Sequence, residues 1–380
     1  MKKIIRSSTI PLSLSQFCRQ LLESLSENYE VIALSSPGKE LDSLAETGRI
    51  KTRAVSMARR IAPFSDIKSL YRLIRVLRKE NPDIIHSMTP KAGLLSMMAA
   101  RFAGVPVRVH TFTGLVFPTS KGLKKRILMM CDKVTSLCAT HIIAEGEGVR
   151  NDLRDNGITK KEIRILGHGN MRGVDLDYFN PERYREERSQ IRERLKVGEE
   201  TVVFIFVGRV VKDKGIEELV NAFRRLRDEG SDVRLLMVGA EEESDKISEE
   251  SMQIIRKDKD IFFTDEWIED VAPYYAAANM LVFPSHREGF PNVVLEAGAM
   301  KLPAVVTDIN GSREIITEGI NGCVIKCGDS DALYSAMKSL AEDKPLRERM
   351  GERARSNVAA KYERGFVTEC HKRFYEEILR

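Results

Sequence analysis

The sequence predicts an α/β protein made of two Rossmann-like αβα domains, each with a parallel sheet. Short apolar runs alternate with amphipathic stretches along the chain, and this alternation is typical of βαβ units. It is interrupted once, by a charged segment at residues 180–196 in which Pro181 breaks regular structure. A length of 380 residues also agrees with two domains of roughly 100–200 residues each.

In the first half of the chain, apolar runs predict five strands. Residues 1–6 are interpreted as the first strand rather than a signal peptide, because serines, a threonine and Pro11 follow at once. Apolar residues spaced three and four apart predict helices, which alternate with the strands. The remaining strands are expected at residues 29–34, 84–87, 105–111 and 141–144, and helices at 66–80 and 94–102.

The second half repeats the alternation after residues 175–180. The run at residues 202–208 is apolar at nearly every position, as strands covered on both faces of a parallel sheet are. Further strands are expected at residues 233–239, 280–284 and 303–307, and helices at 217–227, 271–278, 293–300 and 362–380.

Composition excludes several classes of protein. Hydrophobic residues make up 42% and charged residues 31% of the chain, which excludes a mainly disordered chain, a fibre or a small disulfide scaffold. No run approaches the roughly 20 apolar residues of a spanning helix. The six cysteines form no CxxC pair, so we expect reduced thiols in a cytoplasmic protein. Cys323 and Cys327 lie in a strand-like run, where burial is expected rather than metal binding.

Charge is distributed unevenly along the chain. Through Asp175 there are 29 Lys and Arg against 16 Asp and Glu, a balance of +13, and the remainder has a balance of −8. A basic half suggests a polyanionic partner, such as a phosphorylated substrate, an anionic membrane or nucleic acid.

One segment combines a strand, a loop and a helix with two carboxylates. The expected strand ends at Pro284, a glycine-containing loop follows, and a helix begins near Asn292. Backbone N–H groups at such a helix start bind phosphate, helped by the helix dipole. Glu288 and Glu296 flank this position, and an ionised carboxylate is a natural acceptor for sugar or ribose hydroxyls.

A second segment also follows a strand and precedes a helix. Arg209 and Lys214 lie there, with Gly208 and Gly215, at the carboxyl end of the strand where ligands bind in open α/β sheets. A guanidinium fork and an ammonium are suited to a pyrophosphate.

These two segments resemble the donor-site motifs of family 4 retaining glycosyltransferases of GT-B fold. Further segments resemble the bacterial capsule and O-antigen members of that family: Pro90-Lys91-Ala92-Gly93, Gly104-Val105-Pro106-Val107-Arg108, Thr113-Gly114-Leu115-Val116-Phe117 and Gly173-Val174-Asp175. The resemblance implies two domains facing across a cleft. Residues 1–175 would bind the acceptor and residues 176–361 the nucleotide sugar, while the C-terminal helix, about 362–380, would pack back on the first domain.

The resemblance also implies roles for single residues. Arg209 and Lys214 would neutralise the leaving diphosphate, Glu288 would contact the donor sugar, and Glu296 would hold the ribose hydroxyls. The donor site would also include Gly208, Gly289, Phe290, Pro291, Asn292 and Val293. No metal or other cofactor is implied, because the two cations and the helix terminus would replace a divalent ion. Attack on the front face of the sugar, with the leaving phosphate accepting the proton, would retain the anomeric configuration.

The N-terminal half departs from the family pattern. Residues 8–15 lack the glycine-rich loop of many relatives, and Thr113 stands where many have histidine. Candidate acceptor contacts are Ser13, Lys91, His110 and Thr113. For His110 a structural role is the alternative.

The expected function is transfer of a hexosyl or N-acetylhexosaminyl group from a UDP-sugar to a lipid-linked, undecaprenyl diphosphate saccharide in surface polysaccharide synthesis. The enzyme would associate peripherally with the inner face of the cell membrane. Residues 120–130 place four cations beside an apolar run, which fits an interfacial helix or a helix whose apolar side faces the core. Alternatives are a nucleotide-sugar epimerase of the same fold and a non-catalytic polyanion-binding protein. No reading module for nucleic acid is present.

Overall fold

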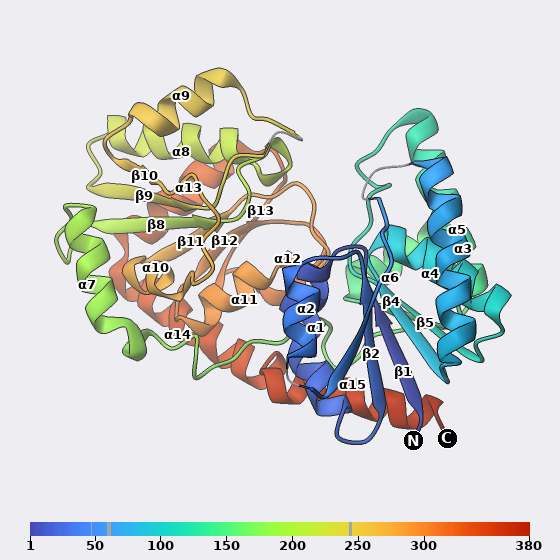
Figure 1. The fold of residues 1–380 in the computed structure, drawn as a ribbon. Helices are drawn as coiled ribbons and strands as arrows, with labels where there is room; N and C mark the ends of the chain where they lie inside the picture. The colour runs from blue at the N-terminus through green and yellow to red at the C-terminus, as the bar shows by residue number, and fades with distance from the viewer. Residues whose placement is uncertain (47, 59–61, 243–244) are drawn as a thin grey trace. The chain divides into compact units, whose positions relative to one another are not determined.

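The computed structural model describes residues 1–46, 48–58, 62–242 and 245–380, and in it the chain divides into two compact units. Unit 1 consists of Met1–Gly173 with Arg364–Arg380, and unit 2 of Val174–Glu363 (Figure 1). These boundaries lie two residues from the expected ones. The Val174 amide donates to the carbonyl of Tyr362 at 2.8 Å, which ties both ends of unit 2 together.

Unit 1 contains a seven-stranded sheet in the order β3-β2-β1-β4-β5-β6-β7, in which every pair of neighbours is parallel. Its strands are β1 (Lys3–Ser7), β2 (Glu30–Ser35), β3 (Ile50–Ala54), β4 (Ile84–Met88), β5 (Val107–Phe112), β6 (His141–Ala144) and β7 (Ile163–Arg164). Its helices are α1 (Pro11–Leu25), α2 (Lys39–Ala45), α3 (Pro63–Glu80), α4 (Pro90–Ala103), α5 (Gly122–Cys138), α6 (Glu147–Asp155) and α15 (Arg364–Ile378).

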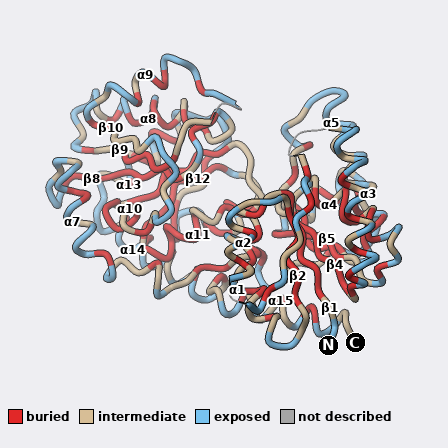
Figure 2. The backbone as a smooth tube through the Cα atoms, viewed as in Figure 1, coloured by how far each residue is buried: buried red, intermediate tan, exposed pale blue. Residues whose placement is uncertain are grey.

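Two apolar clusters cover the two faces of the unit 1 sheet. The neighbouring residues Ile4 and Ile5 of β1 are both fully buried but belong to different clusters, as alternating side chains of a strand do. The final helix α15 supplies Phe374 and Tyr375 to the cluster around Ile4. The C-terminal helix therefore packs on unit 1 although the chain reaches it only after unit 2 (Figure 2).

Unit 2 contains a six-stranded parallel sheet in the order β10-β9-β8-β11-β12-β13. Its strands are β8 (Val202–Val207), β9 (Val233–Val238), β10 (Ile261–Phe263), β11 (Met280–Phe283), β12 (Ala304–Thr307) and β13 (Gly322–Ile325). Its helices are α7 (Arg185–Arg194), α8 (Ile216–Asp228), α9 (Glu249–Lys257), α10 (Ala272–Ala277), α11 (Asn292–Ala299), α12 (Ser312–Ile315), α13 (Ser330–Glu342) and α14 (Lys344–Lys361), with 3₁₀ turns at Pro181–Tyr184 and Lys212–Lys214.

The strand order of each sheet reverses direction at one place. In unit 1 this switch lies between β1 and β4, and in unit 2 between β8 and β11. Ligands of open α/β sheets bind outside the carboxyl ends of the two strands at such a switch point. The loops after β8 and β11 carry the two motifs singled out from the sequence, so the topology directs attention to them.

The expected fold class, two parallel-sheet αβα domains, is confirmed, whereas several elements were not predicted. Strand β3 buries only Ile50 and so shows no apolar run, and β10 has only three residues, too few for a clear alternation. Helix α14 buries Met350, Ala354 and Val358 along one narrow line, a weaker pattern than a broad apolar face. The expected burial of Cys327 is wrong: it lies beyond the end of β13 and is exposed, and Cys323 is only partly buried.

None of the described helices combines the length and the apolar character that crossing a bilayer requires.

Candidate active site

The loops after β8 and β11 touch each other directly at the switch point of unit 2. Gly215 has φ +67°, and a Cβ atom at this position would lie 2.1 Å from the carbonyl oxygen of Pro284. Only glycine fits such a close approach with a left-handed backbone. The His286 amide also donates to the carbonyl of Asp213 at 2.8 Å. The two motifs therefore form one continuous site.

Lys214 and Glu288 form an ion pair at the centre of this site. Lys214 Nζ contacts Glu288 Oε1, and both side chains are mostly buried. The ammonium also lies 5.1 Å from the centroid of the Phe283 ring at the end of β11, a cation–π distance. The structure thus brings together two of the three residues expected to be catalytic.

The same carboxylate is held by a buried hydroxyl. Ser285 Oγ donates to Glu288 Oε1 at 2.8 Å, and Thr307 Oγ1 at the end of β12 donates to the carbonyl oxygen of Ser285. Ser285 and Thr307 are fully buried. Neither was singled out in the sequence. Thr307 reaches Ser285 from the neighbouring strand, which only the sheet order reveals, whereas Ser285 lies three residues before Glu288 in the same loop.

Arg209 lies at the rim of the site and is half-exposed. Its guanidinium contacts Glu242, which follows β9. The loops after β8 and β9 are in close contact, since a Cβ atom on Gly239 would lie 2.0 Å from the carbonyl oxygen of Gly208. Both expected phosphate ligands, Arg209 and Lys214, therefore already have a carboxylate partner.

Glu296 is buried in helix α11 rather than exposed on its surface. Tyr275, on α10, donates through its hydroxyl to Glu296 Oε2 at 3.1 Å. Phe290 and Pro291, expected near the donor, are also buried, and the Phe290 ring packs 5.5 Å from the ring of Tyr362. Their side chains contribute to the core, so their backbone is the part placed to meet a ligand. Gly289, Asn292 and Val293 are partly exposed at the start of α11.

Further side-chain contacts surround the second loop. His286 Nε2 and Glu218 Oε1, on helix α8, are 2.7 Å apart. The hydrogen bond to Glu218 raises the pKa of His286 above its usual value, and the same bond lowers the pKa of Glu218. Nearby, Arg287 pairs with Asp213 at 3.0 Å. These pairs were not predicted, because the residues of each are about 70 positions apart.

The switch point of unit 1 holds a smaller polar cluster. Thr9 follows β1 and Thr89 follows β4, and their hydroxyl oxygens are 2.8 Å apart. Thr9 Oγ1 also accepts from the Ala92 amide at 3.2 Å, so it satisfies one N–H group at the start of α4. Ser13 lies nearby in the first turn of α1 and is partly exposed. Thr113, just after β5, is also partly exposed.

Two of the expected acceptor contacts have other roles in this structure. His110 is 1% exposed, and its ring rests on Gly93 of α4, where a Cβ atom would lie 2.3 Å from Cε1. Its Nδ1 is 2.8 Å from Ser87 Oγ, and burial lowers the pKa of His110 to about 3. His110 therefore packs between β5 and α4, which corrects the expectation that it contacts acceptor. Lys91 pairs with Asp66 of α3 at 2.5 Å and is mostly buried.

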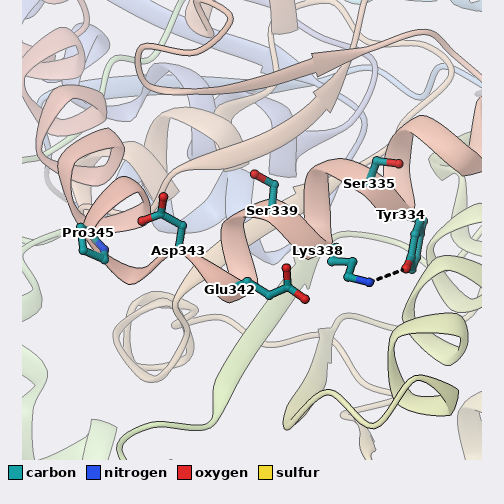
Figure 3. A pocket seen from close by; sticks show the side chains of 7 residues that line it. All are labelled: Tyr334, Ser335, Lys338, Ser339, Glu342, Asp343 and Pro345. Carbon is teal, nitrogen blue, oxygen red and sulfur yellow. Dashed lines mark hydrogen bonds between the residues drawn. The ribbon is translucent and has the colours of Figure 1, made fainter.

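A surface hollow elsewhere in unit 2 is unrelated to these loops. It is lined by residues of α13 and the start of α14, and Lys338 and Tyr334 lie side by side on its wall (Figure 3). Lys344, beside the hollow, pairs with Glu200 just before β8. The hollow therefore lies at the edge where the strands begin, opposite the edge that carries Lys214 and Glu288.

Within the described residues, no three His, Cys, Asp or Glu side chains are grouped where they could hold a metal ion. Arg209 and Lys214, the two cations expected at the phosphate, are each in contact with a carboxylate.

Two parallel-sheet units with polar loops at the switch point of the second define the class of GT-B glycosyltransferases. Residues 187–357 match the family model "Glycosyl transferases group 1", and residues 14–169 match "Glycosyl transferase 4-like domain". The chain is 32% identical, over its whole length and 98% of the relative, to the capsular polysaccharide biosynthesis glycosyltransferase CapM of Staphylococcus aureus. The chain belongs to the group 1, family 4 glycosyltransferases and is an enzyme of that type, and these matches favour a glycosyltransferase over the epimerase alternative.

Other relatives and structures agree with this family. The chain is 27% identical, over 77% of its length and 74% of the relative, to the Escherichia coli UDP-Gal:alpha-D-GlcNAc-diphosphoundecaprenol alpha-1,3-galactosyltransferase. Among solved structures, Anabaena HepE in complex with UDP and glucose superposes with a TM-score of 0.81, covering 100% of this chain and 99% of that one at 17% identity. At this identity, the likeness to HepE shows the fold of the chain alone.

Proposed function

We propose that the enzyme transfers a hexosyl or N-acetylhexosaminyl group from a UDP-sugar to an undecaprenyl diphosphate-linked saccharide, with retention of configuration. The observation that carries the donor assignment is the Lys214–Glu288 pair at the switch point of unit 2. The sugar and acceptor classes are supported by relatives whose names specify UDP-galactose and diphospho-undecaprenol substrates. Unit 2 would bind the donor and unit 1 the acceptor.

In this proposal the two cations of the site, Lys214 and Arg209, exchange their carboxylate partners for the diphosphate when the donor binds. Lys214 would turn from Glu288 to the diphosphate, and Arg209 from Glu242. The freed Glu288 carboxylate, still held by Ser285, could then accept hydrogen bonds from sugar hydroxyls. Glu296, fixed by Tyr275, would accept from the ribose, and the backbone N–H groups of Gly289, Phe290 and Asn292 would face the sugar and phosphate.

The main catalytic effect would be stabilisation of charge on the departing diphosphate. Arg209, Lys214 and the start of α11 would supply fixed positive charge where negative charge develops. The acceptor hydroxyl would attack on the face from which the diphosphate leaves, and a phosphate oxygen would take its proton. We propose that no metal ion takes part.

We also propose that the enzyme works at the cytoplasmic face of an anionic membrane, where a lipid-linked acceptor is located. The excess of Lys and Arg in residues 1–175 supports this, because cations near an anionic surface contribute about 1 kcal/mol each. Nucleic acid is not an expected partner.

Two measurements test the proposed function. Thermal shifts across a panel of nucleotide sugars should show one or a few UDP-sugars that raise the melting temperature, because a ligand that binds only the folded state stabilises it. Product analysis with that donor should then show transfer only when an undecaprenyl diphosphate saccharide is present. Conversion of the nucleotide sugar to its epimer without acceptor would instead support the epimerase alternative.

A further inference from the structure

Helix α5 exposes apolar side chains to solvent in addition to those that it packs on the core, Leu128, Met129 and Val134. Leu123, Ile127 and Met130 are 72%, 41% and 61% exposed. Their spacing of four and three residues places them on one side of the helix, and we call these three residues the α5 ridge. The opposite side carries Thr135 and Ser136, both buried. A helix that packs one face on a core usually has polar side chains on the other face, so the exposed apolar residues on this side of α5 need another explanation.

A second apolar line runs along α3. Phe64, Ile67 and Tyr71 are all exposed, Phe64 to 91%, and their spacing again places them on one side. Both helices pack beside α4: Asp66 of α3 pairs with Lys91 of α4, and the charges of both residues act on the Cys131 thiol of α5. The first half of α3 and the middle of α5 therefore lie close together on unit 1.

Cations surround both apolar lines. They are exposed at Lys68, Arg72 and Arg75 of α3, and at Lys121, Lys124, Arg126 and Lys133 on or beside α5. Among the described residues no carboxylate forms an ion pair with any of them. The nearby acidic residues of these helix segments are Asp66, which pairs with Lys91, and Asp132, which is partly buried.

We infer that the α5 ridge inserts into the interfacial region of an anionic bilayer, with Phe64, Ile67 and Tyr71 of α3 beside it. Exposed apolar side chains flanked by lysine and arginine are the features of helices that lie in a membrane interface. The apolar residues would enter the boundary between headgroups and acyl chains, and the cations would meet anionic headgroups. This inference rests on the proposed function for its biological setting, and it adds insertion to charge attraction.

Insertion and charge attraction respond differently to salt. Salt screens exposed charges over roughly 8–10 Å at physiological ionic strength, whereas burial of apolar surface persists or strengthens. Binding by charge alone would vanish at high salt. Binding with insertion should leave a fraction that salt does not remove.

Vesicle flotation with the full chain tests the inference directly. Phosphatidylglycerol-rich vesicles should bind the protein at least tenfold more than phosphatidylcholine vesicles at low salt, and a part of the binding should remain at 1 M salt. The variant Leu123→Ser/Ile127→Ser/Met130→Ser should lose this salt-resistant part. Neutralising Lys121, Lys124, Lys125 and Arg126 to Gln should instead remove the preference for anionic lipid.

Matched controls are Phe102→Ser at the far end of α4 and Ile320→Ser in unit 2. Both replace exposed apolar residues, and both variants should bind vesicles like the unchanged protein.

A spectroscopic variant reports the position of the ridge. Ile127→Trp adds a second tryptophan to Trp267, and the emission that it adds should shift to shorter wavelength on anionic vesicles and be quenched by brominated acyl chains. Unchanged emission, or salt-resistant binding by the serine variant, would overturn the inference. So would a concentration-dependent dimer that the serine variant abolishes, because a second copy would then cover the ridge.

Failure of the inference can be told apart from failure of the proposed function. The serine variant should keep the thermal shift given by a UDP-sugar, which also shows that it is folded. If the unchanged protein binds vesicles but no nucleotide sugar, the donor assignment fails while insertion stands. If it binds the sugar but not vesicles, insertion fails and the donor assignment stands.

Discussion

The hydroxyl of Ser285 lies 2.8 Å from Glu288 Oε1, the same carboxylate oxygen that Lys214 contacts. Ser285 is itself fixed, because Thr307 donates to its carbonyl oxygen. Glu288 is therefore oriented by buried groups that do not depend on Lys214. When Lys214 turns to a diphosphate, Ser285 can still hold the carboxylate toward the sugar.

This relationship makes Ser285 a positioning residue. Ser285→Ala should lower kcat about tenfold, equivalent to roughly 1.4 kcal/mol, the range of one hydrogen bond to a charged group. The donor KM should change less than threefold, because Ser285 itself does not meet the donor. Steady-state kinetics with saturating acceptor measures both constants. Thr307→Val, which removes the hydroxyl behind Ser285, should give a smaller effect in the same direction, and a change in KM alone would contradict this role.

Removal of either cation should slow transfer. Arg209→Ala and Lys214→Ala each remove a charge expected to stabilise the departing diphosphate, which is worth roughly 2–4 kcal/mol, or about 30- to 1,000-fold in kcat. Lys338→Ala is a matched control, since Lys338 also pairs with a carboxylate, Glu229, but lies at the opposite edge of the unit 2 sheet, and its effect should stay below threefold. Near-normal turnover of a folded Arg209 or Lys214 variant at saturating donor would show that the cation is not catalytic.

How far the sequence could predict this site depends on the distance between partners in the chain. The strand–loop–helix segments around Arg209 and Glu288 were predictable because each is local: an apolar run, a glycine turn and a helix start follow one another. The order of the strands is not local. Thr307 reaches Ser285 because β12 lies beside β11, and Tyr275 reaches Glu296 across 21 residues.

Burial of a side chain is the second property of the site that the sequence could not determine. His110 has the same side-chain chemistry whether it faces a cleft or a core, so the sequence left a contact with the acceptor and a structural role both open. In the structure the ring of His110 packs on Gly93 of α4, and the buried Glu296 accepts a hydrogen bond from Tyr275. The apolar run at Ile127–Met130 was ambiguous for the same reason. There the structure divides the run, because Ile127 and Met130 are exposed while Leu128 and Met129 pack on the core.

The two carboxylates should differ in the kinetic constant that they affect. Glu296→Gln should chiefly raise the donor KM, because a ribose contact is equally strong before and in the transition state. Glu288→Gln should chiefly lower kcat, because Glu288 is expected beside the reacting sugar. Initial rates over a range of donor concentrations separate the two. The reverse pattern would mean that the roles are exchanged.

Transfer should continue in excess chelator. Two cations and the start of α11 are proposed to supply the positive charge that a divalent ion gives in other transferases. Rates measured with EDTA, and after readdition of magnesium or manganese, should agree within about twofold. A strict requirement for the added ion would refute the metal-free mechanism, and the Lys214→Ala variant should not be rescued by either metal.

Stability should fall as pH rises through the titration of Asp132. Burial in α5 raises the pKa of this carboxyl from 3.8 to about 7. Between pH 4 and 7 the folded chain therefore holds a proton that the unfolded chain has released, and the free energy of unfolding decreases over that interval. Asp132→Asn removes this penalty. The free energy of unfolding of the variant should match that of the unchanged protein near pH 4 and exceed it above pH 8 by about 1–4 kcal/mol. The upper value is three pKa units at about 1.4 kcal/mol each.

Urea unfolding across this pH range measures the difference, and Glu27→Gln, which alters an exposed carboxylate, should show no such trend. A gain that is equal at pH 4 and pH 8 would mean that Asn packs better than Asp in α5 and that the charge of Asp132 is not the cause.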